Sequence, residues 1–241
     1  LKCIQVTSAG LDRVPLDYCK AHGITVYNAG GVYSAPMAEF VLGGILQLYK
    51  ESKFFAENQA AHRWEKHRGL RELSGKTACI IGTGSVGSAI ARRLRAFDVQ
   101  TVGINRSGHP AAEFDQIQPT CRLDDLLPLA DLVICAMPLT TETADLFDSV
   151  RLAKIKPGAV FVNVARGKVT DQQALVEALQ SGRLFGAVLD VFEEEPLPRS
   201  SPLWDMEQVI LTPHNSFVGE HNGERLFKCI KEHLYELSKE C

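Results

Sequence analysis

The sequence has no C-x-x-C pair and no group of cysteines and histidines at the spacing of zinc ligands, although it contains seven residues of each type. Several of the cysteines lie within apolar runs, which is typical of buried free thiols in a reducing compartment. We therefore expect no metal site, no disulfide framework and a cytoplasmic location.

Long apolar runs are also missing. No run approaches the roughly 20 residues that a membrane-spanning helix needs, and the N-terminus lacks the basic-then-apolar pattern of a signal peptide. Positive charge is not in excess, because 26 lysines and arginines face 29 aspartates and glutamates, a net charge of −3. We therefore expect neither a membrane nor a nucleic acid as a partner. The residues that are present, 45% apolar and 23% charged, are the mix of an ordinary globular protein.

From Thr77 onward, short apolar segments alternate with amphipathic ones. Apolar residues recur on one face of a helix over residues 85–97, and a second helix over 171–180 begins at the capping residue Asp171 and stops before Gly182. Strand–helix alternation predicts an α/β fold with a parallel, doubly wound sheet. The expected strands are residues 77–81, 99–104, 132–136, 159–164, 185–189 and 209–211.

The first 70 residues have a different character. Residues 1–6 have the composition of a buried strand, and residues 25–27 of a second, short one. Two strands are too few for a sheet that is stable alone, so we expect earlier strand–helix units outside these 241 residues. A continuous helix is expected over 36–61, a domain boundary close to residue 70, and a closing helix over 219–237.

The loop Gly82-Thr83-Gly84-Ser85-Val86-Gly87 fits the pattern G-x-G-x-x-G. It follows an apolar strand and opens an amphipathic helix, as dinucleotide binding requires. The first glycine permits a tight turn, the second lets the backbone approach a pyrophosphate, and the third lets helix and strand pack closely. The alternative is a glycine-rich turn that binds no ligand.

At the end of the following strand stands Asn105-Arg106-Ser107. An aspartate or glutamate at this place would hydrogen-bond the ribose 2′-hydroxyl of NAD. Here no carboxylate repels a 2′-phosphate, while Arg106 and Ser107 can donate to one. The tripeptide therefore favours NADP over NAD as cofactor, the alternative being an exposed loop arginine.

Three further segments lie where expected strands end, over the ligand crevice of a doubly wound sheet. Asn163-Val164-Ala165-Arg166-Gly167 offers an arginine that can bind a carboxylate in bidentate fashion. Residues 189–196 carry a run of glutamates, and residues 212–214 end in a histidine, which next to a carboxylate can serve as acid and base near neutral pH. Taken singly, each segment has a structural explanation as a cap or a solvated loop.

In this order, G-x-G-x-x-G, N-V-A-R-G, L-D-V-F-x-x-E-P and T-P-H, the segments resemble the motifs of the D-isomer-specific 2-hydroxyacid dehydrogenases. The resemblance extends to residues 34–39 and 137–140. It implies a Rossmann-type dinucleotide-binding domain over 71–218. It also implies a flavodoxin-like substrate domain, of which residues 1–70 supply a part together with the linking helix, and to which the helix over 219–241 returns.

The resemblance also implies roles for individual residues. Arg166 would hold the substrate carboxylate and polarise the keto oxygen. His214 would give a proton to the carbonyl oxygen as hydride arrives, and Glu195, the glutamate immediately before the proline, would orient it. Ala9 and Gly10 fall where backbone amides of the family receive the substrate carboxylate.

Cofactor contacts follow in the same way. Ala165 and Asp190 match residues that line the nicotinamide, and Pro138 and Thr143 match residues beside the adenosine and ribose. The implied activity is hydride transfer between NADP(H), or NAD(H), and a small 2-keto or D-2-hydroxy acid. Glyoxylate, hydroxypyruvate and larger 2-keto acids remain open as substrates. A dinucleotide-sensing corepressor or another non-catalytic binding module on the same fold is the alternative.

The expected helix over 36–61 carries apolar residues on more than one face, so it must be buried on several sides. In the resembling family this region joins the two domains and forms a two-fold dimer contact. We therefore expect a homodimer centred on this helix and on the polar stretch 62–68. The alternative is a helix that merely fills the space between two domains of one chain.

Overall fold

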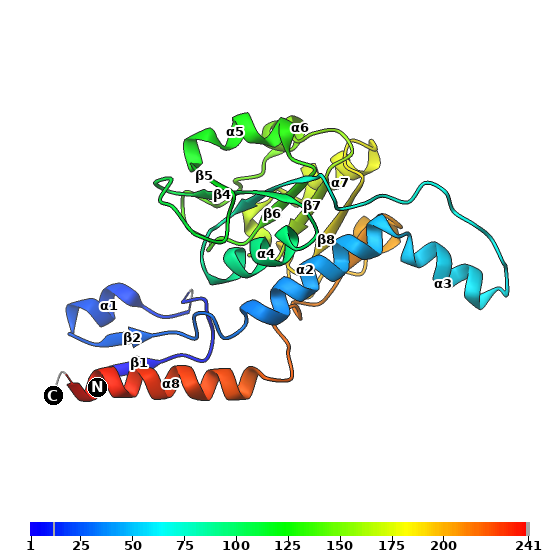
Figure 1. Ribbon diagram of the computed structural model, residues 1–241. Helices are drawn as coiled ribbons and strands as arrows, with labels where there is room; N and C mark the ends of the chain where they lie inside the picture. Colours follow the sequence, from blue (N-terminus) through cyan, green and yellow to red (C-terminus); the bar gives the residue numbers. More distant parts are fainter. Residues whose placement is uncertain (12, 240–241) are drawn as a thin grey trace.

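The computed structural model describes residues 1–11 and 13–239. Figure 1 shows a large α/β unit and a small unit, which are connected by a long helix and by the segment before the last helix. The strands are β1 (Cys3–Gln5), β2 (Thr25–Tyr27), β3 (Thr77–Ile81), β4 (Gln100–Asn105), β5 (Gln116–Pro119), β6 (Leu132–Cys135), β7 (Val160–Asn163), β8 (Gly186–Leu189) and β9 (Val209–Leu211). The helices are α1 (Leu16–Ala21), α2 (Ser34–Tyr49), α3 (Ser52–Ala60), α4 (Ser85–Arg95), α5 (Leu123–Leu126), α6 (Ser149–Lys154), α7 (Gln172–Gln180) and α8 (Asn222–Lys239).

The large unit is built on a seven-stranded parallel sheet in the order β5-β4-β3-β6-β7-β8-β9. The order reverses at β3, as in a doubly wound Rossmann-type sheet, so the predicted fold class is confirmed. The six expected strands from Thr77 onward form with small shifts of their ends. Strand β5 was not expected, because its sequence QIQP is half polar, as suits an edge strand.

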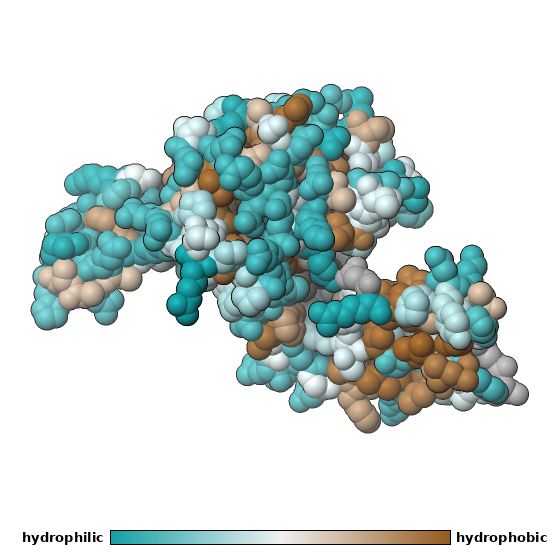
Figure 2. All heavy atoms as spheres, turned by 180° about the vertical axis from the view of Figure 1, so that it is seen from behind, coloured by the Kyte–Doolittle hydropathy of each residue, from teal (hydrophilic) through white to brown (hydrophobic). Residues whose placement is uncertain are grey.

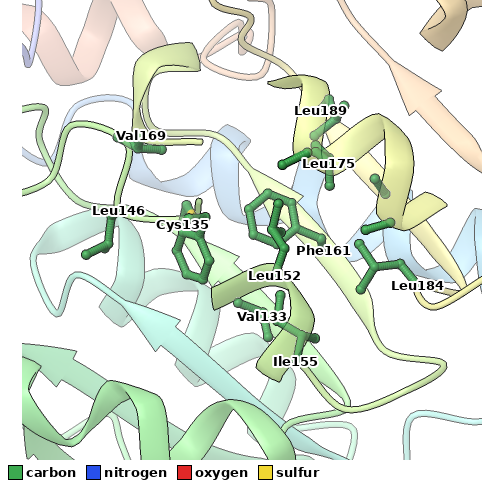
Figure 3. Packing of buried hydrophobic residues seen from close by; sticks show 14 of the residues in the cluster. Val133, Cys135, Leu146, Leu152, Ile155, Phe161, Val169, Leu175, Leu184 and Leu189 are labelled. Carbon is green, nitrogen blue, oxygen red and sulfur yellow. The ribbon is translucent and has the colours of Figure 1, made fainter. Parts of the chain in front are cut away.

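Buried apolar side chains fill both faces of this sheet. On one face α5, α6 and α7 cover a cluster that includes Phe161, Val133 and Leu152, shown in Figure 3. On the other face α2 and α4 pack on the sheet. Helix α2 comes close to β8 at Gly44, where an added Cβ would lie 2.5 Å from Val188 Cγ1. Helix–sheet packing within the chain therefore explains this glycine.

The expected single helix over 36–61 is wrong in one respect, because α2 and α3 are separate helices. Glu51 between them has a left-handed backbone with φ of 51°, which ends a right-handed helix. Hydrogen bonds to a segment far away in the sequence hold α3 in its different direction. Lys53 Nζ donates to the carbonyl oxygens of Glu207 at 3.0 Å and Val209 at 2.8 Å. Such long-range bonds have no signature in local sequence.

The small unit consists of the parallel pair β1–β2 with α1 and α8. The first strand was expected to be buried, but its three residues are only half-buried. Helix α8 is fastened to the strands by His233, whose Nδ1 lies 2.6 Å from Gln5 Oε1 and whose ring stacks on Tyr27. Figure 2 shows apolar side chains gathered on the surface of this unit. Phe227 and Leu234 are exposed apolar residues of α8. Within the described residues, no helix combines the length and apolar character needed to cross a membrane.

Candidate active site

The glycine turn between β3 and α4 has three glycines with three different surroundings. Gly82 has φ of 104°, and a Cβ there would lie 2.5 Å from the Ala136 carbonyl oxygen. At Gly87 a Cβ would lie 1.9 Å from the Gly82 carbonyl oxygen, whereas at Gly84 it would meet nothing within 4 Å. The outer glycines are therefore required by packing, and the middle one leaves its backbone open to a ligand.

Helix α4 begins directly after that open position. Its N-cap is Gly84, which has no side chain to cap the first amide groups of the helix. These N–H groups and the helix dipole attract an anion. The open backbone at Gly84 and the uncapped helix start at Ser85 and Val86 together fit the pyrophosphate of a dinucleotide.

The loop after β4 is organised by Asn105. Its Oδ1 accepts from the backbone N–H of Gly108 at 2.7 Å and of His109 at 3.1 Å. Its Nδ2 donates to the His109 carbonyl at 2.8 Å and to Thr83 Oγ1, in the glycine turn, at 3.0 Å. The side chain of Asn105 is therefore fully used within the protein. Arg106 and Ser107 are exposed on the loop that it shapes.

A cavity of about 1140 Å³ lies between the two units. The small unit contributes most of the residues from 7 to 18 to the wall of this cavity. The large unit contributes segments that follow β6, β7 and β9, together with Val86 at the start of α4. The expected site residues on this wall are Ala9, Gly10, Val86, Pro138, Ala165, Arg166 and His214. Five expected segments, among them three of the four ordered motifs, therefore meet in one cavity.

His214 is held against Glu195 at the edge of this cavity. Its Nδ1 lies 2.8 Å from Glu195 Oε2, and Glu195 Oε1 accepts from the Phe192 backbone N–H at 3.0 Å. The side chains of His214 and Glu195 are 43% and 37% exposed. The carboxylate is therefore fixed at both oxygens, and Nε2 is the imidazole nitrogen left for a ligand.

The loop that carries His214 is fastened by Asp190, whose exposure is only 1%. Asp190 Oδ1 accepts from Thr212 Oγ1 at 2.6 Å and from the Asn215 N–H at 2.7 Å, and both its oxygens accept from the Ser216 N–H. His214 itself has φ of 52°. These bonds hold the histidine backbone in a left-handed conformation that a non-glycine residue rarely adopts.

Arg166 faces the same cavity from the turn after β7. Its Nη1 donates to the Ala165 carbonyl at 2.7 Å, and its own carbonyl accepts from Asn163 Nδ2 at 3.0 Å. The next residue, Gly167, lies against the loop of Glu195, since a Cβ there would be 1.8 Å from the Phe192 carbonyl oxygen. The glycine of N-V-A-R-G thus lets the arginine turn and the glutamate loop pack together.

On the opposite wall, the loop 7–10 is tied down through its carbonyl oxygens. The Ser8 carbonyl accepts from the Ala29 N–H at 2.9 Å, and the Ala9 carbonyl accepts from Asn28 Nδ2 at 2.8 Å. Tyr33 Oη donates to the Thr7 carbonyl. Ala9 and Gly10 are therefore held in place across the cavity from Arg166.

Two aromatic residues of the site were not expected from the sequence. Phe217 lies edge-on to His214, with ring centres 6.3 Å apart, and edge-on to Tyr33 at 5.8 Å. Both aromatic rings line the cavity. Neither has a distinctive local pattern, and only the tertiary fold brings residue 33 beside residue 217.

The remaining expected site residues lie outside the cavity wall. Thr143 fastens the turn after β6, because its Oγ1 donates to the Pro138 carbonyl at 2.8 Å and accepts from the Thr140 N–H at 2.7 Å.

Residues 1–11 and 13–239 contain no group of three or more histidine, cysteine, aspartate or glutamate side chains placed to hold a metal ion.

Residues 42–216 match the family model of the D-isomer specific 2-hydroxyacid dehydrogenase, NAD binding domain. The chain is 38% identical over 246 residues to a glyoxylate reductase of Thermofilum pendens, covering 99% of this chain and 72% of that protein. Among solved structures, a D-isomer specific 2-hydroxyacid dehydrogenase family protein from Aeromonas salmonicida superposes with a TM-score of 0.87 at 36% identity, over 99% of this chain and 76% of that one. An NADPH-dependent glyoxylate/hydroxypyruvate reductase from Sinorhizobium meliloti, in complex with NADP and sulfate, superposes with a TM-score of 0.84 at 27% identity, over 99% and 76%.

The chain therefore belongs to the D-isomer specific 2-hydroxyacid dehydrogenase family. It is an NAD(P)-dependent 2-hydroxyacid dehydrogenase. The resemblance carried by the ordered motifs is confirmed at the level of family, fold and cofactor class.

Proposed function

We propose that this protein reduces a small 2-keto acid to the D-2-hydroxy acid, with NADPH as the preferred hydride donor. The observation that carries the proposal is the convergence of Arg166 and the Glu195-held His214 on one cavity. A guanidinium and a carboxylate-paired imidazole are the two groups that a 2-keto acid needs, one for its carboxylate and one for its carbonyl oxygen.

Each of these residues has a distinct task in the proposal. Arg166 binds the substrate carboxylate and polarises the keto oxygen, helped by the backbone of Ala9 and Gly10. His214 donates the proton from Nε2 to the carbonyl oxygen. Glu195 accepts from Nδ1, so it orients the ring and stabilises the imidazolium that gives up the proton. The alternative is a dinucleotide-sensing corepressor on the same fold, and an assay of NADPH oxidation with 2-keto acids separates it from an enzyme.

When bound, the nicotinamide dinucleotide supplies the hydride. Gly84 and the first turn of α4, including Ser85, would hold its pyrophosphate, while the packing of Gly82 and Gly87 shapes the turn. Pro138 and Thr143 would lie beside the adenosine and ribose, and Ala165 and Asp190 toward the nicotinamide. Because the Asp190 oxygens accept from residues 212–216, we propose that Asp190 acts mainly by holding the His214 loop.

The preference for NADPH rests on the loop after β4. Asn105 shapes this loop, and Arg106 and Ser107 can donate to a 2′-phosphate from it. The S. meliloti relative is NADPH-dependent by its name. Fluorescence titration of the protein with each cofactor tests the preference, and tighter binding of NADH than of NADPH would refute it.

Glyoxylate and hydroxypyruvate are the substrates we propose first, because relatives of this chain are named for their reduction. The test is NADPH oxidation followed by absorbance with glyoxylate, hydroxypyruvate, pyruvate and phenylpyruvate. We expect the highest kcat/KM with one of the first two. Efficient turnover only of a bulky 2-keto acid would contradict this choice while leaving the reaction class intact.

We also propose the domain organisation and cellular setting. Residues 71–218 form the dinucleotide-binding domain. Residues 1–70 comprise part of the substrate domain and the linking helix, and residues 219–241 form the helix that returns to the substrate domain. The described cysteines are free thiols, which suits a reducing compartment such as the cytoplasm.

A homodimer is the proposed assembly. Helix α3 and the segment after it project from the large unit in Figure 1, and residues 61–70 are all exposed. Trp64 is 96% exposed, and at Gly43 on α2 a Cβ would meet nothing within 4 Å. A large exposed aromatic side chain and an open position on a helix face are each typical of a protein interface. Light scattering should give twice the chain mass, and a concentration-independent monomer would refute the dimer.

A further inference from the structure

An ion pair lies beside the glycine turn, on the side where the adenosine end of a dinucleotide is expected. Arg106 Nη2 lies 3.3 Å from Glu142 Oε1. Arg106 stands on the loop after β4, and Glu142 stands on the turn after β6. These two strands flank β3, which leads into the glycine turn. The pair therefore joins the two loops that border that turn on either side.

Both loops are held by hydrogen bonds close to their backbones, whereas the two charged side chains are exposed. Asn105 closes the first loop through four hydrogen bonds. In the second loop Thr140 Oγ1 accepts from the Glu142 N–H at 3.2 Å, and Thr143 Oγ1 bridges the Thr140 N–H and the Pro138 carbonyl. By contrast, the side chains of Arg106 and Glu142 are 88% and 66% exposed.

An exposed ion pair is weak, worth about 0.2–1 kcal/mol. A phosphate monoester carries a charge of about −1.5 to −2 and three acceptor oxygens, so it competes well with a single carboxylate for a guanidinium. A 2′-phosphate that takes Arg106 must displace Glu142 and then lie near its negative charge. A ribose with a free 2′-hydroxyl carries no such charge and leaves the pair intact.

We propose that Glu142 is a specificity-determining residue, whose carboxylate occupies Arg106 and must be displaced by the 2′-phosphate of the dinucleotide. Glu142 lowers the affinity for NADP, which carries the 2′-phosphate, and leaves the affinity for NAD unchanged. It therefore reduces the preference for NADP over NAD that Arg106 provides. The inference rests on the assignment of Arg106 to the 2′-phosphate in the proposed function.

The test is calorimetric titration with two fragments, adenosine 2′,5′-bisphosphate and adenosine 5′-monophosphate, which differ only in the 2′-phosphate. In Glu142→Gln we expect the bisphosphate to bind about 1.4- to fivefold more tightly, the factor that an exposed ion pair is worth, and the monophosphate to bind unchanged. The gain should shrink at high salt, because exposed charges are screened. Glu236→Gln, an exposed glutamate on α8, changes the net charge equally and should leave both affinities unaltered.

Arg106→Ala distinguishes the role of Glu142 from the role of Arg106 itself. If it weakens the bisphosphate and abolishes the gain from Glu142→Gln, the coupling is demonstrated. A Glu142→Gln gain that is absent, that appears equally with the monophosphate, or that persists without Arg106 would overturn the proposal. If Arg106→Ala leaves bisphosphate affinity unchanged in the native background, the assignment of Arg106 itself is wrong.

Discussion

At the scale of single residues, the site depends on how the His214 imidazole is held. Its Nδ1 is committed to Glu195, and its backbone is fixed by Asp190 through the neighbouring residues 215 and 216. The phenyl ring of Phe217 lies edge-on to the imidazole. An imidazole restrained in this way presents one nitrogen in one direction, which is what a proton donor to a carbonyl oxygen requires.

The first prediction concerns Glu195→Gln. The amide can still accept from the imidazole, but it removes the negative charge 2.8 Å from Nδ1 that favours the imidazolium. A hydrogen bond to a charged partner is worth roughly 1.5–3 kcal/mol, so kcat with a 2-keto acid should fall by about tenfold or more while NADPH affinity stays the same. Steady-state kinetics and cofactor titration of the variant measure this, and an unchanged kcat would exclude Glu195 from the mechanism.

The residues that the sequence could identify are those in ordered motifs. Arg166, His214 and the loop 7–10 do line one cavity, because each motif stands at the end of a strand or in a turn. Tyr33, Phe217 and Glu142 were not identified. Their importance arises from contacts between segments far apart in the chain, for which a single sequence has no local pattern.

At the scale of elements, the glycine turn provides a paired test. In Gly84→Ala the added methyl group points to open space, so the free energy of unfolding should change by less than about 1 kcal/mol. The methyl group would instead block the close approach of a pyrophosphate. NADPH affinity should fall at least about tenfold, which corresponds to about 1.4 kcal/mol.

Gly87→Ala is the matched comparison. Its methyl group would lie 1.9 Å from the Gly82 carbonyl oxygen, so the start of α4 must move. The expected loss in unfolding free energy is roughly 3 kcal/mol, the upper end for overpacked sites. Urea denaturation and fluorescence titration of both variants check the pair, and equal stability losses would contradict the distinction.

Local sequence patterns predicted most, but not all, of the strands and helices. Alternating apolar and amphipathic segments predicted six strands of the large sheet and the helices α4 and α7, because buried parallel strands and capped helices have strong local patterns. The break at Glu51 was missed, because it depends on Lys53 reaching carbonyl oxygens some 150 residues away in the chain. The edge strand β5 was missed because it is half polar.

At the scale of the whole molecule, the end of the sheet opposite the site is stabilised by Asp131. Its carboxylate accepts from Lys156 Nζ at 2.8 Å and from the Thr77 N–H at 3.0 Å, with Lys76 Nζ at 4.0 Å. Burial alone would raise the pKa of Asp131, but the bonds from Lys156 and Thr77 outweigh it and hold the pKa below its ordinary value. The Asp131 carboxylate therefore stabilises the fold at pH values above the pKa that it has in the unfolded chain. This stabilisation is lost as the pH falls through the lower pKa that it has in the folded protein.

Asp131→Asn should accordingly lower the free energy of unfolding at neutral pH by about 1–3 kcal/mol, the cost of removing the charge from a half-buried, hydrogen-bonded carboxylate. The difference from the native protein should shrink below about pH 4. Urea denaturation at several pH values measures both effects. Because the residue is remote from the cavity, cofactor affinity should stay the same, and a difference in stability that grows in acid would contradict the assignment.

The central claim is that His214 gives a proton to a 2-keto acid in a site that also binds NADPH. The most direct measurement compares native protein with His214→Ala, recording NADPH oxidation with glyoxylate or hydroxypyruvate and NADPH affinity by fluorescence on the same samples. We expect the variant to bind NADPH about as tightly as the native protein while its kcat falls by a factor on the order of 10²–10⁴, the usual contribution of a general acid. Near-native turnover in His214→Ala, or native protein that binds NADPH but reduces no 2-keto acid, would contradict it.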